Sequence, residues 1–312
     1  MTRRLPLTSL KRALTVGAAL ICGAGALAAT QPAMASPTAH HAHHAHSAHP
    51  AHPVHGVAYV ALGDSYAAAP LVPDQVDAHC LRSSNNYPSL VARSSAGTRL
   101  TDVTCSGATT VDMTSPQGTA APQLDAVNRR TDLVTLTIGG NDIGFSTVLG
   151  TCAQLGATDP SGAPCRAYLT GSGTDRVTES IAATGPKVAQ VIRGIHRRAP
   201  HARIVVVGYP ALFPENGVGC TSATVPLAAG DFPYLRDKEK ELNSMLARQA
   251  RLGGATYVDT YTPTVGHDLC APAGTRWIEP FVPQSPAAPL HPNAQGESAM
   301  ASAVQRALTH RH

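Results

Sequence analysis

Short apolar runs, separated by polar stretches rich in Gly and Pro, dominate the chain from residue 57 onward. Four of these runs are VAYVAL at 57–62, DLVTLTI at 132–138, RIVVVG at 203–208 and ATYVD at 255–259, and RLTDV at 99–103 is a fifth candidate. They are rich in Val and Ile and are bounded by Gly, Pro or polar residues. Such runs are typical of parallel strands that are buried on both faces of a sheet.

Three further segments have the spacing of helices. One helix face, with apolar residues at i, i+3, i+4 and i+7, is formed by Val188, Val191, Ile192 and Ile195. A second helix is predicted within about 235–252, with the charged run 238–241 on a solvated face, and a third from Pro292 to about Leu308. Strands that alternate with helices predict a parallel α/β sheet with helices on both faces, in one domain covering 57–309.

The first 35 residues have the composition of a secretory signal peptide. A basic start is followed by an apolar run from about 13 to 29, and Ala33-Met34-Ala35 supplies a small-x-small cleavage pattern. A retained membrane anchor is the alternative, but no long apolar stretch recurs, so we expect no stable membrane insertion. The protein is therefore predicted to be secreted and extracellular, with residues 1–35 removed.

Residues 36–56 form a low-complexity segment of His, Ala and Pro that contains eight histidines. Such a segment buries too little apolar surface to offset the entropy lost on ordering, which predicts a disordered linker. Histidine-rich tracts also bind metal ions. A secreted metal-binding protein without enzymatic activity is therefore the alternative to an enzyme.

The charge balance changes once the signal peptide is set aside. The whole chain has 24 Lys and Arg against 20 Asp and Glu. Four of the basic residues and none of the acidic ones lie in the first 35 residues, so the remainder carries 20 of each. A formally neutral chain lacks the basic footprint of a nucleic-acid-binding protein, so we expect no nucleic-acid partner.

The chain has six cysteines after the predicted signal peptide: Cys80, Cys105, Cys152, Cys165, Cys220 and Cys270. An even number in an exported chain predicts disulfides, although the sequence leaves the pairing open. We favour the sequential pairing Cys80–Cys105, Cys152–Cys165 and Cys220–Cys270. Each bond would stabilise the fold by about 2–4 kcal/mol. A metal site is less favoured because no CxxC spacing occurs.

Four polar motifs stand where strands end or helices begin: Gly63-Asp64-Ser65, TCSGATT with Gly107, Gly139-Gly140-Asn141-Asp142, and Leu290-His291-Pro292-Asn293. Ligands of open parallel sheets bind beyond the carboxyl ends of the strands. A serine hydroxyl becomes a nucleophile when a base such as His takes its proton, and preorganised N–H groups stabilise the resulting oxyanion. Ser65 with His291, assisted by N–H groups of Ser65, Gly107 and Asn141, would supply this chemistry.

These motifs resemble the four blocks of the SGNH hydrolase superfamily, also called GDSL lipases and esterases. GDSY matches the first block, Gly107 the second, GGND the third and HPN the last, and together they span nearly all of 57–309. With the signal peptide and six cysteines, the chain is most similar to secreted actinobacterial members. The resemblance implies a flavodoxin-like three-layer α/β/α fold with a central parallel sheet. It also implies Ser65 as nucleophile, His291 as base, an oxyanion hole of Ser65, Gly107 and Asn141, and no metal or cofactor.

One departure from the family pattern concerns the group that orients the histidine. Many members carry an Asp three residues before it, where this chain has Ala288. We therefore expect a Ser65–His291 dyad in which the main-chain carbonyl of Ala288 accepts a hydrogen bond from Nδ1–H. The alternative is a carboxylate from elsewhere in the chain, such as Glu279 or Asp268.

The expected substrate is a lipid or a small ester. The predicted pocket wall is apolar and consists of Ala67, Ala68, Pro70, Ile143, Phe145 and Leu290. An apolar wall favours an acyl chain, and thus a lipase, phospholipase or esterase. Deacetylation of carbohydrate is the alternative within the same superfamily, although the few aromatic residues argue against a sugar platform. A monomer is the default expectation.

Overall fold

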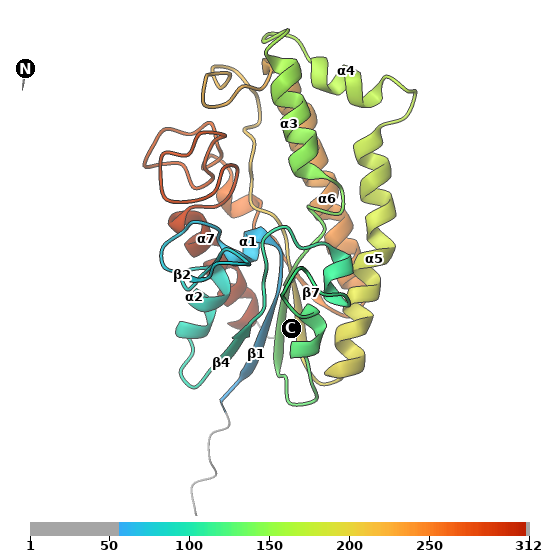
Figure 1. Ribbon diagram of the computed structural model, residues 1–312, viewed down its shortest axis with the longest axis vertical. Coiled ribbons are helices and arrows are strands. Elements are labelled where there is room, and N and C mark those ends of the chain that lie inside the picture. Colours follow the sequence, from blue (N-terminus) through green and yellow to red (C-terminus); the bar gives the residue numbers. More distant parts are fainter. Residues whose placement is uncertain (1–55, 310–312) are drawn as a thin grey trace, which may run out of the picture. The chain divides into compact units, whose positions relative to one another are not determined.

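The computed structural model describes residues 56–309 (Figure 1). The predicted signal peptide and the His-rich linker up to residue 55 lie outside the described residues. No helix within the described part of the chain is long and apolar enough to cross a membrane.

The centre of the fold is a five-stranded parallel sheet with the strand order β4-β1-β5-β6-β7. The strands are β1 (Ala58–Gly63), β4 (Arg99–Asp102), β5 (Leu133–Thr137), β6 (Arg203–Val207) and β7 (Thr256–Val258). All five strands predicted from the apolar runs are confirmed. The order is that of flavodoxin-like folds, in which the chain reverses its direction across the sheet beside β1 and leaves a ligand crevice at the carboxyl ends of the strands.

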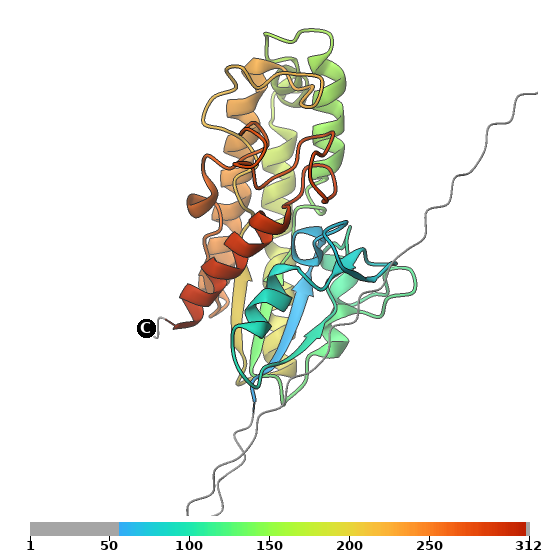
Figure 2. The same ribbon diagram turned by 90° about the vertical axis from the view of Figure 1, so that its left-hand side faces the viewer.

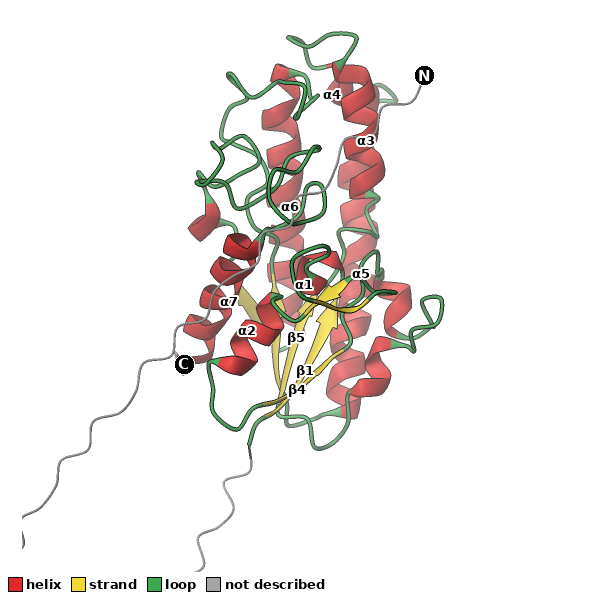
Figure 3. Ribbon diagram, turned by 60° about the vertical axis from the view of Figure 1, so that its left-hand side comes forward, coloured by secondary structure: helices red, strands yellow, loops and turns green. Residues whose placement is uncertain are grey.

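Helices cover both faces of this sheet and make the three layers expected (Figures 1 and 3). On one face, α2 (Tyr87–Arg93) contacts β4 and lies against α7 (Ala294–Thr309), which contacts β7. On the other face, α5 (Arg176–Arg198) packs along α6 (Phe232–Leu252), and α6 contacts β6 and β7. The three predicted helices correspond to α5, α6 and α7, and Figure 2 shows α7 beside α2 on the same face.

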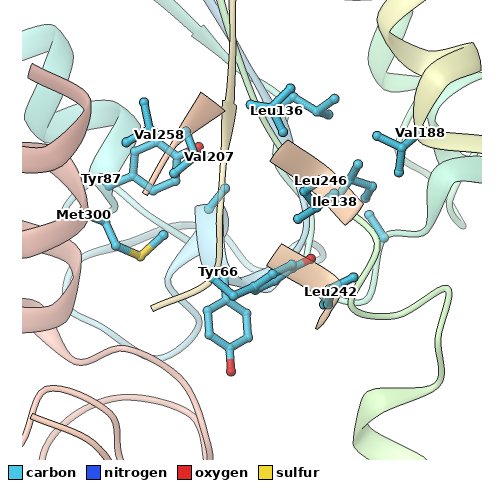
Figure 4. Packing of buried hydrophobic residues seen from close by; sticks show 14 of the residues in the cluster. Tyr66, Tyr87, Leu136, Ile138, Val188, Val207, Leu242, Leu246, Val258 and Met300 are labelled. Atoms are coloured by element: carbon cyan, nitrogen blue, oxygen red, sulfur yellow. The ribbon is translucent and has the colours of Figure 1, made fainter. Parts of the chain in front are cut away.

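The apolar core occupies both sides of the sheet. Figure 4 shows Tyr87 and Met300 on one side of the strands and Val188 and Leu246 on the other. All four side chains are fully buried. Burial of one such side chain contributes about 1.5–3 kcal/mol, so the two helical layers hold the strand ends, and the loops that leave them, in a fixed arrangement.

Several short elements were not predicted from the sequence. They are α1 (Ser65–Ala68), α3 (Phe145–Gly156), α4 (Pro164–Thr170), the hairpin of β2 (Gln75–Asp77) and β3 (Arg82–Ser83), and four 3-10 helices at Thr110–Met113, Gln123–Ala126, Ala229–Asp231 and Thr262–Thr264. Most are too short for an apolar period to be visible. They lie in the connections that surround the carboxyl ends of the strands.

The disulfides are the sequential pairs that we favoured: Cys80–Cys105, Cys152–Cys165 and Cys220–Cys270. The first holds the segment before β3 against the loop that follows β4. The second joins α3 to α4, and the third joins two long loops that precede α6 and α7. All three bonds therefore brace connections rather than the sheet itself.

The charged run 238–241 was expected to form a solvated face, and this expectation is wrong for Glu239. Its side chain is only 2% exposed, and both carboxylate oxygens accept the Leu212 amide at 3.1 and 3.2 Å. Burial raises the pKa of Glu239 well above its usual range. A helix turns by about 100° per residue, so one residue of a charged run faces inward when a buried amide requires an acceptor there.

Candidate active site

The predicted nucleophile lies where β1 turns into α1. Asp64 is the N-cap of α1 and its carboxylate accepts the Tyr66 amide at 3.0 Å, as short polar side chains do at helix starts. Gly63 is required by close packing, because a Cβ at this position would lie 2.7 Å from the Thr137 carbonyl oxygen. The Ser65 side chain consequently leaves the sheet at the carboxyl end of β1, with only 8% of the residue exposed.

Ser65 and His291 are brought together across 226 positions of sequence. His291 Nε2 lies 2.7 Å from Ser65 Oγ. The other ring nitrogen, Nδ1, lies 2.6 Å from the carbonyl oxygen of Pro289. A carbonyl accepts but cannot donate, so Nδ1 carries the proton and Nε2 is free to accept the serine hydroxyl.

The expectation that the Ala288 carbonyl would orient His291 is wrong. The Ala288 carbonyl instead accepts the backbone amide of His291 at 3.2 Å, which closes a turn. That turn directs the next carbonyl, from Pro289, toward the imidazole. A main-chain carbonyl therefore orients the ring, as predicted, but it belongs to the neighbouring residue.

Contacts with Tyr66 and Glu279 hold the loop that carries His291. Leu290 adopts a left-handed conformation with a φ of 65°, which is unfavourable for a non-glycine residue. The Tyr66 hydroxyl donates to its carbonyl at 2.6 Å. Glu279 is fully buried and accepts the side-chain amide of Asn293 at 2.9 Å. Tyr66 thus holds the loop from α1 through the Leu290 carbonyl, and the buried Glu279 holds it through the Asn293 side chain.

Glu279 and Asp268 are the two carboxylates that we considered as orienting groups. Within residues 56–309, neither carboxylate forms a hydrogen bond with the His291 side chain. Glu279 accepts the amides of Gln284 and Ser285 in addition to Asn293. Although burial alone would raise it, these donors hold the pKa of Glu279 below its usual value. Asp268 accepts the amide of Cys270 at 2.9 Å. Both carboxylates therefore shape loops.

We accordingly expect Glu279→Gln and Asp268→Asn each to retain kcat within about tenfold of wild type, because removal of a true orienting carboxylate costs about 10⁴-fold. Steady-state kinetics on a soluble ester would measure this, with circular dichroism to confirm that each variant folds. A loss of several orders of magnitude in a folded variant would show that a side-chain carboxylate orients the histidine.

Two of the three predicted oxyanion donors line the same cavity as the dyad. Ser65, Asn141 and His291 line one cavity, and the Asn141 side-chain amide donates to the Ala108 carbonyl at 2.9 Å. One of its two N–H bonds is used in this way, which leaves the second for a ligand. Gly107 does not line the cavity, and has a φ of 82° that favours glycine.

Asp142 joins the turn that carries Asn141 to the segment that follows Gly107. Its carboxylate accepts the Thr110 amide at 2.9 Å and the Thr110 hydroxyl at 2.5 Å. The second and third motifs of the sequence are therefore tied to each other, and Asp142 has a structural role here.

The cavity beside Ser65 is predominantly apolar. Of the six pocket residues predicted, only Phe145 and Leu290 line it. Its other apolar lining residues are Leu149 of α3, Leu212, and Leu242 of α6, together with Pro289. Half of the apolar wall thus comes from α3 and α6 and half from loops, and Leu149, Leu212, Leu242 and Pro289 were not predicted beside the serine.

Tyr66 and Tyr209, which the sequence analysis missed, complete the surroundings of the serine. Tyr66 lies 4.9 Å from the His291 ring, centroid to centroid. The Tyr209 hydroxyl donates to Asp64 at 2.5 Å. Burial raises the pKa of Asp64 to about 7, although the Tyr209 hydroxyl and Tyr66 amide oppose the shift by stabilising the anion. The only sequence signal for Tyr209 was its position just beyond the run 203–208.

The surroundings of His291 also affect its proton affinity. Burial lowers the pKa of His291 from the ordinary value of 6.5, and the hydrogen bond to the Pro289 carbonyl only partly opposes this. Less than half of the imidazole is therefore protonated at the pH where an ordinary histidine is half protonated.

We expect the acid limb of the kcat/KM profile to have its midpoint below pH 6.5, because the rate rises as His291 loses its proton and its pKa is lowered. A pH series from 4 to 9 at constant ionic strength would measure the limb. The same limb should persist in Asp64→Asn, which removes the neighbouring carboxyl whose pKa burial raises to about 7. A midpoint above the ordinary histidine value would contradict the expectation.

One group of potential metal ligands occurs among the described residues, namely His79, Cys80 and Cys105. Both cysteine sulfurs are joined in a disulfide, so neither is available as a thiolate, the form that binds metal. The absence of a metal and of a cofactor stays a prediction from the sequence.

The sequence and the fold are similar to those of known hydrolases. Residues 61–299 match the model of the GDSL-like lipase/acylhydrolase family. Lipase 2 of Streptomyces coelicolor is 42% identical over 309 residues, covering 95% of this chain and 97% of that protein. The crystal structure of an extracellular lipase from Streptomyces rimosus superposes with a TM-score of 0.67 at 31% identity, over 81% of this chain and all of the other. Phospholipase A1 from Streptomyces albidoflavus also superposes with a TM-score of 0.67, at 28% identity, over 80% of this chain and 99% of that one.

Proposed function

This chain belongs to the GDSL-like lipase/acylhydrolase family and is a carboxylic ester hydrolase, and we propose that it acts through an acyl-enzyme formed on Ser65. The observation that carries the proposal is the 2.7 Å contact between Ser65 Oγ and His291 Nε2. It supports a dyad in which His291 is the base and the Pro289 carbonyl positions it.

The reaction has two halves. Ser65 Oγ attacks the ester carbonyl carbon while its proton passes to His291 Nε2, and the bond to the alcohol breaks as the imidazolium returns that proton to the leaving oxygen. Water then attacks the acyl-enzyme, with His291 accepting its proton, and Ser65 leaves with that proton as the free acid forms. The Pro289 carbonyl stabilises the imidazolium that forms transiently in both halves.

The negative charge that develops on the carbonyl oxygen requires N–H donors. Ser65 and Asn141 both line the cavity that holds the dyad, and the hydrogen bond to the Ala108 carbonyl uses only one N–H of Asn141, which supports their role as donors. Gly107 would add its amide from the turn beside Ala108, where its positive φ turns the peptide. Such donors stabilise the transition state more than the ground state, in which the carbonyl carries less charge.

The apolar lining from α3 and α6 supports a lipid ester as the substrate, with the acyl chain against Phe145, Leu149 and Leu242. The relatives are a lipase and a phospholipase A1 by name. We propose that the natural substrate belongs to this class and that the enzyme is secreted as a mature chain starting at Ser36. The three disulfides and the extracellular relative support export.

A fluorophosphonate probe tests the nucleophile directly, because its phosphorus is attacked by an activated serine. We expect labelling of the mature protein, with the adduct located on the peptide that contains Ser65 by mass spectrometry, and no labelling of Ser65→Ala. An adduct on another serine would overturn the assignment.

A series of p-nitrophenyl esters from acetate to palmitate tests the substrate class. We expect kcat/KM to rise toward longer acyl chains, because each additional buried CH₂ contributes about 0.8 kcal/mol of apolar transfer energy. Activity confined to acetate would point instead to a small-ester or carbohydrate deacetylase.

A further inference from the structure

Tyr209 links the two turns that carry the proposed oxyanion donors. Its hydroxyl donates to the buried carboxylate of Asp64 at 2.5 Å and accepts the Gly140 amide at 2.8 Å. Asp64 immediately precedes Ser65, and Gly140 immediately precedes Asn141. The Tyr209 hydroxyl oxygen thus contacts the residue that precedes each of two proposed donors. These donors, Ser65 and Asn141, follow different strands, β1 and β5.

The tyrosine is itself held in place at several points. The Tyr209 amide donates to Asn243 Oδ1 at 2.8 Å, and Asn243 Nδ2 donates back to the Tyr209 carbonyl at 2.9 Å. Its ring meets the ring of Tyr66 edge-on at 5.0 Å between centroids. Tyr209 is 4% exposed, so its side chain is largely shielded from solvent.

The absence of a side chain at Gly140 allows this approach. A Cβ at Gly140 would lie 3.0 Å from the Tyr209 hydroxyl oxygen and 3.1 Å from the ring carbon that bears it. The φ of Gly140 is not positive, so the backbone conformation itself does not require a glycine here. The glycine is therefore explained by the contact with Tyr209 rather than by the turn.

We propose that Tyr209 is a positioning residue that fixes the distance between the Ser65 and Asn141 oxyanion donors through Asp64 and Gly140. The proposal rests on the proposed function and extends it to a residue outside the four motifs. The physical reason is that an oxyanion hole works only when its donors are held before the charge forms. If the two turns moved apart, each would keep its N–H donor, but the two donors would no longer reach the same substrate oxygen.

The test is a double-mutant cycle between Tyr209→Phe and Asn141→Ala on a soluble p-nitrophenyl ester. Phenylalanine keeps the ring and removes only the hydroxyl. We expect Tyr209→Phe alone to lower kcat by about 10- to 100-fold with little change in KM, because the ring still lines the cavity. In the Asn141→Ala background the same change should cost no more than about twofold, because one of the two donors is already missing.

A matched control separates positioning from the general loss of a buried tyrosine hydroxyl. Tyr59 is 1% exposed, and its hydroxyl lies 2.8 Å from Thr135 Oγ1 within the sheet. Tyr59→Phe should lower the melting temperature but leave kcat unchanged at a temperature where the protein is folded. A merely structural role for Tyr209 would make its variant behave like Tyr59→Phe.

Gly140→Ala gives an independent variant that keeps the tyrosine intact. The added methyl group should displace the Tyr209 hydroxyl and lower kcat, and this loss should not multiply with that of Tyr209→Phe. It also tests the proposal if Tyr209→Phe yields no folded protein.

The outcomes distinguish the two levels of inference. If Tyr209→Phe keeps wild-type kcat, or if its loss multiplies with that of Asn141→Ala, the positioning role is overturned while the hydrolase mechanism stands. If Asn141→Ala itself keeps wild-type kcat, the oxyanion assignment fails, and the positioning role fails with it.

Discussion

Replacement of Ser65 by alanine is expected to lower kcat on an ester substrate by on the order of 10⁴- to 10⁶-fold. Alanine removes the oxygen that forms the acyl-enzyme, and His291 at 2.7 Å from that oxygen then has no proton to take. The remaining N–H donors can still bind a substrate, so a small residual rate over water is expected. Steady-state kinetics with purified mature protein would measure both rates.

The control for this substitution is an exposed serine of the same fold. Ser302 on α7 is exposed and donates its hydroxyl to the Ser298 carbonyl of its own helix, so Ser302→Ala should retain wild-type kcat. The melting temperature of Ser65→Ala should stay near wild type, because within residues 56–309 the Ser65 hydroxyl forms a hydrogen bond with His291 alone. A folded Ser65→Ala protein with wild-type activity would show that the GDSY segment is only a turn.

Replacement of Asn141 by alanine is the second large effect, with an expected loss of about 10²- to 10³-fold in kcat. In the proposed mechanism the side chain supplies an N–H to the oxygen that becomes negative in the transition state. It contributes less to the ground state, so KM should change far less than kcat. Progress curves at substrate concentrations above and below KM would separate the two constants.

A second asparagine provides the control for the loss of an amide side chain. Asn128 is exposed in the loop before β5, where its side chain accepts the Arg130 amide at 3.0 Å, so Asn128→Ala should keep wild-type kcat. Asn141→Ala should also lower the melting temperature slightly, because the hydrogen bond to the Ala108 carbonyl is lost. A rise in KM with unchanged kcat would instead indicate that Asn141 binds the ester equally in the ground state and the transition state.

The strands and the long helices could be predicted because their signals are local. A short run of Val and Ile such as 203–208, bounded by polar residues and Gly, favours a strand buried on both faces. The apolar stripe of α5 repeats over several turns. The short helix α1 could not be predicted in this way, because four residues contain little more than one turn and its start depends on how β1 ends against Thr137.

The residues of the candidate site could be predicted from the sequence because the chemistry restricts them to few residue types. Few functions other than nucleophilic catalysis combine a hydroxyl, an imidazole and N–H donors just after strands. The structure brings Ser65, Asn141 and His291 to one cavity. The apolar wall was predicted less well. Only Phe145 and Leu290 were identified, because any aliphatic residue can line a pocket or fill a core.

The sequence by itself determined the parallel α/β class, the order of the motifs, and the identity of the serine, asparagine and histidine. The tertiary structure alone decided that the carbonyl of Pro289 rather than Ala288 faces His291, that Glu239 turns inward, and that Tyr209 reaches Asp64 across 145 positions. The reason is physical. Strand and helix patterns come from neighbouring residues, whereas a buried hydrogen bond depends on which groups the packed layers bring together, and an unpaired buried group is costly.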